Sequence, residues 1–528
     1  MKRWNGWGEE TTTYPLPETS AQFLAMRIGQ GEPAPDATFH DVLATVPPSR
    51  LPAHPLILTD ADERLRHARG QSLPDWVALR SGEIGSFPDG VAYPTTDADI
   101  QSLIGYAQKT DIALIPYGGG SSVVGHINPS PAGRPVLTLD LSRLNHLLSL
   151  DEKSCLATFE AGARGHEIEA QLRSRGFTLG HFPQSFEFST LGGWVATRSS
   201  VQQSVHYGRI EALFAGGHVE TPIGGLELPP YPASAAGPDL RKLILGSEGR
   251  FGVLTRAIVR LHPLPEAEEF YGVFFPDWEA SADAVRAIVQ NEIPVSMLRA
   301  SDALETETTL ALSGKERMLH WAERGLRLLG YSGERCLLIF GVTGTRRALA
   351  ATRTQTLAIT RAFGGLFTGN LIGKMWRKSR FLTPYLRNTL WECGYAIDTL
   401  ETALPWTAVL PAAQAIQTAI RQAIAEGGER ALVFAHLSHV YRDGASLYIT
   451  VLFRRASPEV TLRRWQSMKN SASQAVLAHG GTISHQHGIG MDHAPYLPAE
   501  KGEIGITVLQ NLCRVFDPRG IMNPGKLV

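Results

Sequence analysis

The sequence predicts a multidomain α+β protein, and three observations support this class. Its 528 residues exceed what one hydrophobic core organises, so roughly two or three domains are expected. From Pro88 onward, helical patterns alternate with short apolar runs that are typical of strands. The segment Pro263-Leu264-Pro265, followed by Glu-Ala-Glu-Glu, is typical of a domain boundary.

These features divide the chain into four expected segments. Residues 1–80 are rich in Trp and Pro and form a lead segment that packs on the main body. Residues 81–265 form a first α+β domain with two subdomains, and residues 266–460 form a second α+β domain with an antiparallel sheet carrying helices on one side. Residues 461–528 are a helical segment that returns to the first domain.

Local patterns place the elements of the first domain. Residues 96–110 carry apolar residues at helical spacing, and residues 113–116 form a short buried strand that leads directly into three glycines. Residues 136–140 and 156–160 are two further strands. A helix over residues 165–175 ends at a glycine, which is a common helix stop.

The second domain reads in the same way. Strands are expected at residues 271–275, 337–342 and 447–453, with helical stretches between them. From Thr461 the chain returns to helix and then enters a loop at residues 480–490. We find no internal repeat and no heptad pattern, so a solenoid or a coiled coil is not expected.

Composition excludes several classes of protein. The net charge is −1, from 50 basic and 51 acidic residues, so no overall field attracts nucleic acid or an anionic membrane. The four cysteines are scattered and suggest a reducing compartment. Neither a secretory leader nor a run of the ~18 apolar residues of a membrane helix is present. We expect a cytoplasmic protein, with peripheral membrane contact left open.

Glycine-rich segments are the strongest functional signal. Pro116–Ser122 reads PYGGGSS, Gln184–Trp194 reads QSFEFSTLGGW, and Gly246–Gly252 reads GSEGRFG. Glycines leave backbone N–H groups uncovered by Cβ atoms, so such loops can enclose a pyrophosphate. Three of them in order predict a dinucleotide cofactor. No GxGxxG opens a helix after a first strand, so the site is not of the Rossmann type.

The order of these segments resembles the vanillyl-alcohol-oxidase-like FAD family. That resemblance implies FAD bound between two α+β subdomains and a separate, ferredoxin-like α+β cap domain. Asp517–Lys526, which reads DPRGIMNPGK, is typical of the FAD-linked oxidoreductases of this family. The resemblance implies that FAD is contacted by Pro116, Tyr117, Gly118, Gly119, Gly120, Ser121, Ser122, Gln184, Ser185, Phe186, Glu187, Phe188, Ser189, Thr190, Gly193, Thr197, Arg198, Ser199, Ser200, Glu248, Gly249, Gly252, Val253 and Leu254.

Within that family the chain is most similar to the alkyldihydroxyacetonephosphate synthases of ether-lipid synthesis. The similarity is carried by WNGWG at residues 4–8, GGW at 192–194, FLTPYLR at 381–387, DGASLY at 443–448 and SHQHG at 484–488. It implies exchange of the acyl chain of acyl-dihydroxyacetone phosphate for a fatty alcohol, with non-covalent FAD as nucleophile. It also implies a homodimer.

The same resemblance assigns roles to five side chains. Tyr448 would be the acid/base group, Arg387 would bind the substrate phosphate, and Arg299, His485 and His487 would assist the reaction. A phenol has a pKa near ~10, so it needs help from neighbours to act as a base. A guanidinium offers a planar fork that matches phosphate oxygens.

Each of these residues also has a structural interpretation. Tyr448 would be an aromatic residue of a strand, Arg387 a solvated helix arginine, and Arg299 one member of an ion pair. His485 and His487 would be structural. Where the synthases have three successive histidines, the middle position here is Gln486, which cannot carry a proton.

The competing enzyme hypothesis is an FAD-linked dehydrogenase of a 2-hydroxy acid. Many such relatives bind a divalent metal through two histidines and a glutamate. The present chain has His436 at the first position but Tyr448 and Gln486 at the other two. Because one ligand of three remains, we expect no metal. A flavin-binding protein without enzymatic activity is the third, least favoured hypothesis.

Overall fold

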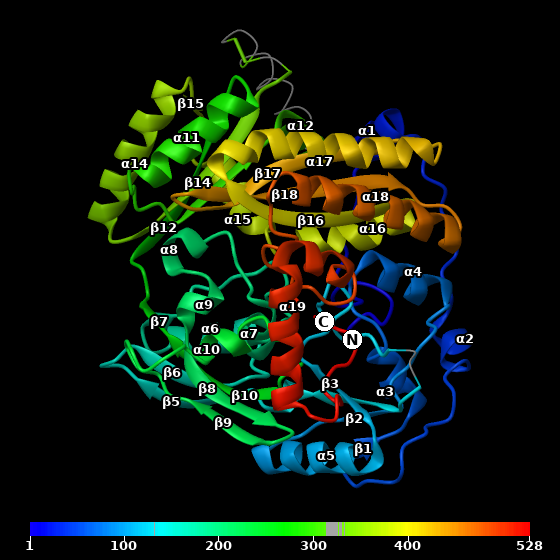
Figure 1. Cartoon of the computed structure of the whole chain (residues 1–528). Helices are drawn as coiled ribbons and strands as arrows, with labels where there is room; N and C mark the ends of the chain where they lie inside the picture. The colour runs from blue at the N-terminus through cyan, green and yellow to red at the C-terminus, as the bar shows by residue number, and fades with distance from the viewer. Residues whose placement is uncertain (131–132, 313–325, 327–329, 332) are drawn as a thin grey trace.

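The computed structural model describes residues 1–130, 133–312, 326, 330–331 and 333–528. Figure 1 shows a lower part built from the N-terminal half and the C-terminal tail, and an upper part built around one large sheet. The lead segment runs along one side of both parts. Its helices are α1 (Glu18–Ile28), α2 (Phe39–Leu43), α3 (Ala61–Arg66) and α4 (Leu73–Ser81).

The first subdomain is a four-stranded sheet in the order β1-β2-β4-β3, in which β2, β4 and β3 are parallel and β1 is antiparallel. Thr96 and Asp99 form a capping box at the start of its helix, and the apolar face of that helix is buried. The elements are β1 (Ile57–Leu58), β2 (Gly90–Ala92), α5 (Asp97–Thr110), β3 (Ala113–Tyr117) and β4 (Val136–Asp140).

The second subdomain is an antiparallel five-stranded sheet in the order β5-β6-β10-β8-β9. The helix expected over residues 165–175 ends two residues earlier, at Arg173 with Ser174 as its C-cap, and the left-handed Gly176, with φ 80°, belongs to the turn that follows. The elements are β5 (Leu147–Asp151), β6 (Leu156–Glu160), α6 (Gly165–Arg173), β7 (Phe177–Thr178), α7 (Leu191–Thr197), α8 (Ser204–Tyr207), α9 (Ile210–Leu213), β8 (Phe214–Thr221), β9 (Gly224–Leu228), α10 (Arg241–Ile244), β10 (Val253–Arg260) and β11 (His262–Pro263).

The upper part contains a seven-stranded antiparallel sheet in the order β15-β12-β14-β13-β17-β18-β16. The expected strand at 271–275 is the end of a longer strand that starts at Ala267, so the acidic residues after the prolines are already in the sheet. Its strands are β12 (Ala267–Phe275), β13 (Met297–Ser301), β14 (Cys336–Gly344), β15 (Leu366–Phe367), β16 (Tyr395–Pro405), β17 (Ala431–Val440) and β18 (Gly444–Arg454).

Helices pack on both faces of this sheet, so the expectation of helices on one side only is wrong (Figure 1). The face toward the first domain is covered by helices in part and is otherwise open to the cavity described below. In β18, Leu447, Ile449 and Val451 are fully buried under the long helices, in the helix-side core, whereas Tyr448 and Thr450 point to the opposite face. The helices are α11 (Trp278–Gln290), α12 (Ala303–Leu312), α14 (Arg346–Ala362), α15 (Leu371–Ser379), α16 (Leu386–Glu392), α17 (Trp406–Glu426) and α18 (Pro458–Ala478).

The C-terminal segment returns to the first domain. Helix α19 (Leu497–Phe516) packs on the second subdomain through Cys513, and Met522 forms a bridge with Leu114 of β3. Asn523 donates hydrogen bonds to the carbonyl oxygens of His126 and Glu248, at 3.1 and 2.7 Å. The tail therefore joins two of the predicted cofactor segments. No helix among the described residues has the length and apolar character needed to cross a membrane.

Candidate active site

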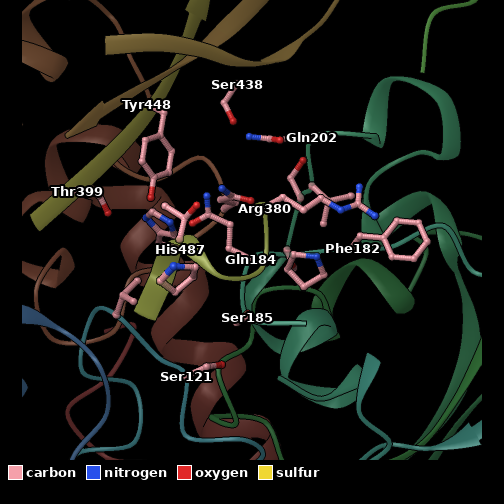
Figure 2. Close-up of a pocket in the computed structure, with 18 of the residues that line it drawn as sticks. Ser121, Phe182, Gln184, Ser185, Gln202, Arg380, Thr399, Ser438, Tyr448 and His487 are labelled. Atoms are coloured by element: carbon pink, nitrogen blue, oxygen red, sulfur yellow. The ribbon is translucent and has the colours of Figure 1, made fainter. Parts of the chain in front are cut away.

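A cavity of about 1080 Å³ lies where the first domain meets the open face of the cap sheet. All three glycine-rich segments, the cap sheet and the segment from β15 to α16 contribute to its lining. In Figure 2, Ser121 of the glycine loop lies at one end of the view, and Ser438 of β17 lies at the other. The sequence-predicted cofactor segments and the predicted catalytic residues thus share one chamber.

The first two glycine segments are in direct backbone contact. A Cβ atom on Gly119 would lie 1.7 Å from the carbonyl oxygen of Phe188, and one on Gly118 would lie 2.3 Å from the hydroxyl oxygen of Thr190. Gly120 adopts φ 70°, which suits glycine. Only glycine permits this approach, and the loop presents its uncovered backbone to the cavity. The chemistry of this cradle fits a dinucleotide pyrophosphate.

Two further contacts hold the cradle. Lys2 of the lead segment donates a hydrogen bond to the carbonyl oxygen of Gly119 at 2.7 Å, and burial lowers the pKa of Lys2 to about 8. The carboxylate of Glu248 accepts a hydrogen bond from the Gly490 N–H at 2.9 Å and another from Ile489. The third glycine segment therefore anchors the loop that carries the histidines.

Most of the predicted cofactor residues line the cavity. They are Pro116, Gly118, Gly119, Gly120, Ser121, Ser122, Gln184, Ser185, Ser189, Thr190, Gly193, Thr197, Ser199, Ser200, Glu248, Gly249, Gly252 and Leu254. Others are absent from the lining because their side chains have partners elsewhere. These are Tyr117 on His67, Phe186 on Phe381, Glu187 with Tyr385, Phe188 on Trp7, Arg198 with Glu211, and Val253 in the core.

Tyr448 lies on a rung of paired residues that crosses the cap sheet. Strand register pairs Ser301 with His436, His436 with Tyr448, and Tyr448 with Glu401. The rings of His436 and Tyr448 stack with centroids 4.9 Å apart, and His487 meets Tyr448 edge-on at 5.9 Å. Adjacent antiparallel strands therefore bring together residues that are up to 147 positions apart in the chain.

Tyr448 is protonated at neutral pH in this setting. Burial raises its pKa to about 12, although a hydrogen bond from Thr399 and the positive charge of Arg387 act in the opposite direction. Burial also lowers the pKa of His487, so its imidazole is neutral near pH 7. The pair thus offers a phenol that can donate a proton and an imidazole that can accept one. Figure 2 shows Tyr448, Thr399 and His487 close together.

Arg387 is not a solvated helix arginine. Its guanidinium lies 4.2 Å from the centroid of the Trp76 ring, and Nη1 donates a hydrogen bond to the carbonyl oxygen of Gln71 at 2.5 Å. Burial lowers its pKa to about 10, which leaves it charged at neutral pH. Because it lines the cavity as a fixed cation, it can bind an anionic group of a substrate.

Arg299 lines the cavity and also forms an ion pair. Its Nη2 lies 2.7 Å from Oε1 of Glu305, and the same oxygen lies 2.9 Å from Nδ1 of His436. Burial alone would raise the pKa of Glu305, but Arg299 and His436 outweigh it and hold that pKa at about 2. The ionised carboxylate therefore orients the imidazole that stacks on Tyr448.

His485 does not line the cavity, and Gln486 does. Oε1 of Glu401 lies 3.1 Å from Nδ1 of His485 and 3.4 Å from Nε2 of His439, and Gln486 donates a hydrogen bond to Oε2 at 2.6 Å. Burial would raise the pKa of Glu401, yet these imidazoles lower it, so the carboxylate is ionised.

The carboxylate and the two imidazoles could hold a metal, since their ligand atoms lie within 4.8 Å of one another. However, the rings of His439 and His485 stack at 4.8 Å with planes only 27° apart. Ligands to one ion must point their in-plane lone pairs at a common position, which stacked rings do not favour. We interpret the group as a hydrogen-bonded carboxylate.

Sequence reasoning missed several residues of the lining. They include Trp7, Phe182, Gln202, Arg380, Thr399, Ser438 and His439. Thr399 and Ser438 lie on strands, where polar and apolar residues alternate. That alternation shows which residues face the cavity only when the neighbouring strand is known. The signal for Arg380 was its place one residue before the FLTPYLR segment.

The comparisons with known proteins agree with this geometry. Residues 88–227 match the family model of an FAD binding domain, and residues 264–527 match that of the C-terminal domain of FAD linked oxidases. Alkyldihydroxyacetonephosphate synthase of Trypanosoma brucei brucei is 32% identical over 485 residues, which are 89% of this chain and 78% of the relative. The chain belongs to the alkyldihydroxyacetonephosphate synthase family. The enzyme of the same name from Dictyostelium discoideum is 30% identical over 99% of this chain and 85% of its own length.

Solved structures extend the match to the whole fold. An alkyldihydroxyacetonephosphate synthase structure superposes with a TM-score of 0.86 at 28% identity, covering 100% of this chain and 99% of the other. p-Cresol methylhydroxylase, at 15% identity and a TM-score of 0.69, shares the fold. The predicted α+β class, with its two-subdomain FAD-binding domain and cap, is confirmed, and the family uses FAD.

The family also has oxidoreductase relatives. The mitochondrial D-lactate dehydrogenase [cytochrome] of Arabidopsis thaliana is 25% identical over 89% of this chain and 78% of its own length. In this member of the synthase family, the rung residue opposite His436 is Tyr448, and the residue next to Glu401 on the loop is Gln486. These two positions distinguish the cavity from the metal-binding pattern that the dehydrogenase hypothesis requires.

Proposed function

We propose that this chain is an FAD-dependent synthase of ether lipids. One acyl-dihydroxyacetone phosphate and one fatty alcohol give one alkyl-dihydroxyacetone phosphate, one fatty acid carboxylate and one proton. The bond between the dihydroxyacetone carbon and the acyloxy oxygen breaks, and a bond from that carbon to the alcohol oxygen forms, with no net oxidation. The observation that carries the proposal is that the phenol Tyr448 and the cation Arg387 face the same cavity as the FAD-binding loops.

Arg387 would bind and orient the substrate through its phosphate. Its stacking on Trp76 and its bond to the Gln71 carbonyl fix the guanidinium before any ligand arrives. A preorganised planar cation binds phosphate oxygens with two parallel hydrogen bonds, which sets the direction of the rest of the substrate. The three-carbon unit would then lie between Arg387 and the glycine loops.

Tyr448 and His487 would move protons at the reacting carbon atoms. Because the phenol is protonated and the imidazole neutral near pH 7, Tyr448 donates and His487 accepts. The stacked His436, held by Glu305, limits the ring of Tyr448 to one orientation. Bound FAD supplies the nucleophilic nitrogen. The protein supplies orientation, proton transfer and exclusion of water.

One experiment separates the enzyme hypotheses. The purified flavoprotein receives palmitoyl-dihydroxyacetone phosphate and labelled hexadecanol without an electron acceptor, and labelled alkyl product is expected while the flavin spectrum stays oxidised. Bleaching of the flavin by D-lactate, together with no alkyl product, would favour the 2-hydroxy acid dehydrogenase instead and overturn the proposal.

The phosphate assignment has its own variant. Arg387→Gln should raise KM for the acyl substrate about 10- to 100-fold, since a hydrogen bond to a charged group is lost. Arg361→Gln, at the exposed end of α14, removes the same charge far from the cavity and should leave KM unchanged. Equal KM values for the Arg387→Gln variant and the unmodified enzyme would contradict this role.

We further propose that the enzyme acts as a homodimer in the cytoplasm and meets its lipid substrates at a membrane surface. Helix α15 supports the last point, because Leu371 is 53% exposed and Leu382 beyond its end is 39% exposed, beside Lys374, Arg377 and Lys378. Binding to vesicles containing anionic lipid, and its loss in a Leu371→Asp variant, tests this contact. Light scattering tests the dimer.

A further inference from the structure

Arg380 also lines the cavity, in addition to Arg387 and Arg299. Three aromatic rings surround its guanidinium, with centroids at 4.7 Å for Phe381, 5.2 Å for Phe182 and 5.5 Å for Trp376. Figure 2 shows Arg380 and Phe182 next to each other in the pocket. The mechanism described above uses Arg387 and leaves this cation without a role.

Arg380 carries a charge that is not neutralised by a direct partner. Its Nη1 donates a hydrogen bond to Oε1 of Gln203 at 3.0 Å, and Gln203 in turn donates to Glu268 at 2.7 Å. Among the described residues, no carboxylate forms an ion pair with Arg380, and its buried Nε has no hydrogen-bond partner. Burial lowers its pKa, but an arginine remains protonated at neutral pH. A buried cation of this kind favours an anionic ligand.

The free edge of the guanidinium suits one kind of anion. With Nη1 occupied by Gln203, the Nε side of the fork remains, and a carboxylate can engage such an edge with two parallel hydrogen bonds. The aromatic rings leave an apolar environment in which this charge-assisted bond is strengthened. A hydrated phosphate dianion would need more donors than this edge offers.

An apolar wall continues from Arg380. Helix α15 ends immediately before it and presents Ile372, Met375 and Trp376 to the cavity. Phe274 of β12 and Leu337 of β14 extend the same lining along the cap sheet. A cation at one end of an apolar surface matches a molecule with an anionic head and a long hydrocarbon chain.

We propose that Arg380 binds the carboxylate of the departing fatty acid, with the acyl chain along α15. This inference rests on the proposed function, because acyl exchange releases a carboxylate in addition to the phosphate that stays on the product. Arg387 and Arg380, which are held by different partners in one cavity, thus bind two different anions. Separate sites keep the leaving group from competing for the phosphate position.

Binding to the holoenzyme tests the assignment without turnover. Dodecanoate and dodecanol are titrated separately by calorimetry into the unmodified protein and into Arg380→Gln, Arg380→Lys and Lys109→Gln. We expect Arg380→Gln to weaken dodecanoate binding about tenfold or more and to change dodecanol binding less than twofold. Arg380→Lys should be intermediate, because an ammonium keeps the charge and loses the fork. Lys109→Gln removes an exposed charge from α5 in the first domain and should match the unmodified protein.

A second comparison separates the two arginines. Arg387→Gln should weaken the binding of dihydroxyacetone phosphate and leave the binding of dodecanoate unchanged. Arg380→Gln should weaken the binding of dodecanoate and leave that of dihydroxyacetone phosphate unchanged. If Arg380→Gln and Arg380→Lys both bind dodecanoate as the unmodified protein does, the inference is wrong, whatever the outcome of the ether-forming assay. If dodecanoate binding depends on Arg387 instead, it is also wrong. Flavin absorbance confirms that each variant is folded. If the Arg380→Gln protein loses its flavin, the binding data for Arg380→Lys alone test the inference.

Discussion

Replacing Gly119 with alanine should separate the two cofactor loops. The new Cβ atom would lie 1.7 Å from the carbonyl oxygen of Phe188 and 2.5 Å from its carbonyl carbon. Both are backbone atoms, so no flexible side chain can move to relieve the overlap. Overpacking typically costs about 1–3 kcal/mol, and a clash between two backbones belongs at the upper end of that range. A loss of about 3 kcal/mol in cofactor affinity corresponds to a dissociation constant roughly 100-fold higher.

The assay titrates FAD into the apoprotein and measures binding through the quenching of flavin fluorescence. Gly105→Ala is the matched control, because Gly105 lies within helix α5 and a Cβ atom there meets nothing within 4 Å. That change should leave FAD affinity unchanged and stabilise the protein by about 0.5–1 kcal/mol. If the Gly119→Ala protein binds FAD within threefold of the unmodified affinity, the contact between the loops does not shape the cofactor site and the reasoning fails.

Three further changes probe the rung across the cap sheet. Glu305→Gln should lower the free energy of unfolding by about 3 kcal/mol at neutral pH, because the pKa of Glu305 is lowered from 4.5 to about 2 in the folded protein. This stabilisation is present above pH 4.5 and is lost as the pH falls toward 2. Urea unfolding should therefore show a large difference in stability between variant and unmodified protein at pH 7 and a smaller one at pH 3. The Tyr448→Phe variant should retain its flavin, and its rate of ether formation in product assays should fall about 100-fold or more. Gln486→Glu would place a second carboxylate against Glu401, where the present contact is 2.6 Å, so activity should fall as pH rises; a flat pH profile would contradict the ionised state of Glu401.

Short-range signals explain what could be predicted from the sequence. The glycine segments could be recognised from the sequence alone, because a close approach of two backbones requires glycine in any fold. The helix at residues 97–110 has its capping residues immediately before its first apolar residues, so both signals are local. The strand at 136–140 is a short, fully buried run. The resemblance to an FAD family then supplied the fold class, which the comparisons confirm.

Long-range pairing explains what could not be predicted. Glu401 is one of two acidic residues in an eleven-residue strand, and nothing near it in sequence shows that it meets His439 and His485. The pairing of His436 with Tyr448 depends on strand register, and a shift of one residue would send the phenol into the helix-side core. Trp376 and Phe381 are close to Arg380 in the sequence, but Phe182 comes from a distant segment, so the full set of aromatic rings around Arg380 could not be predicted.

The departure at Gln486 has a physical explanation in this network. A glutamine cannot relay a proton, but here its amide donates to Glu401, and donation is all that this position supplies. Glu401 already accepts a hydrogen bond from Ser446 at 2.8 Å, and the imidazoles of His439 and His485 lie beside the same carboxylate. The proton-carrying groups that face the cavity are then Tyr448 and His487. Position 486 therefore holds the carboxylate behind the site, and glutamine performs that role without an imidazole.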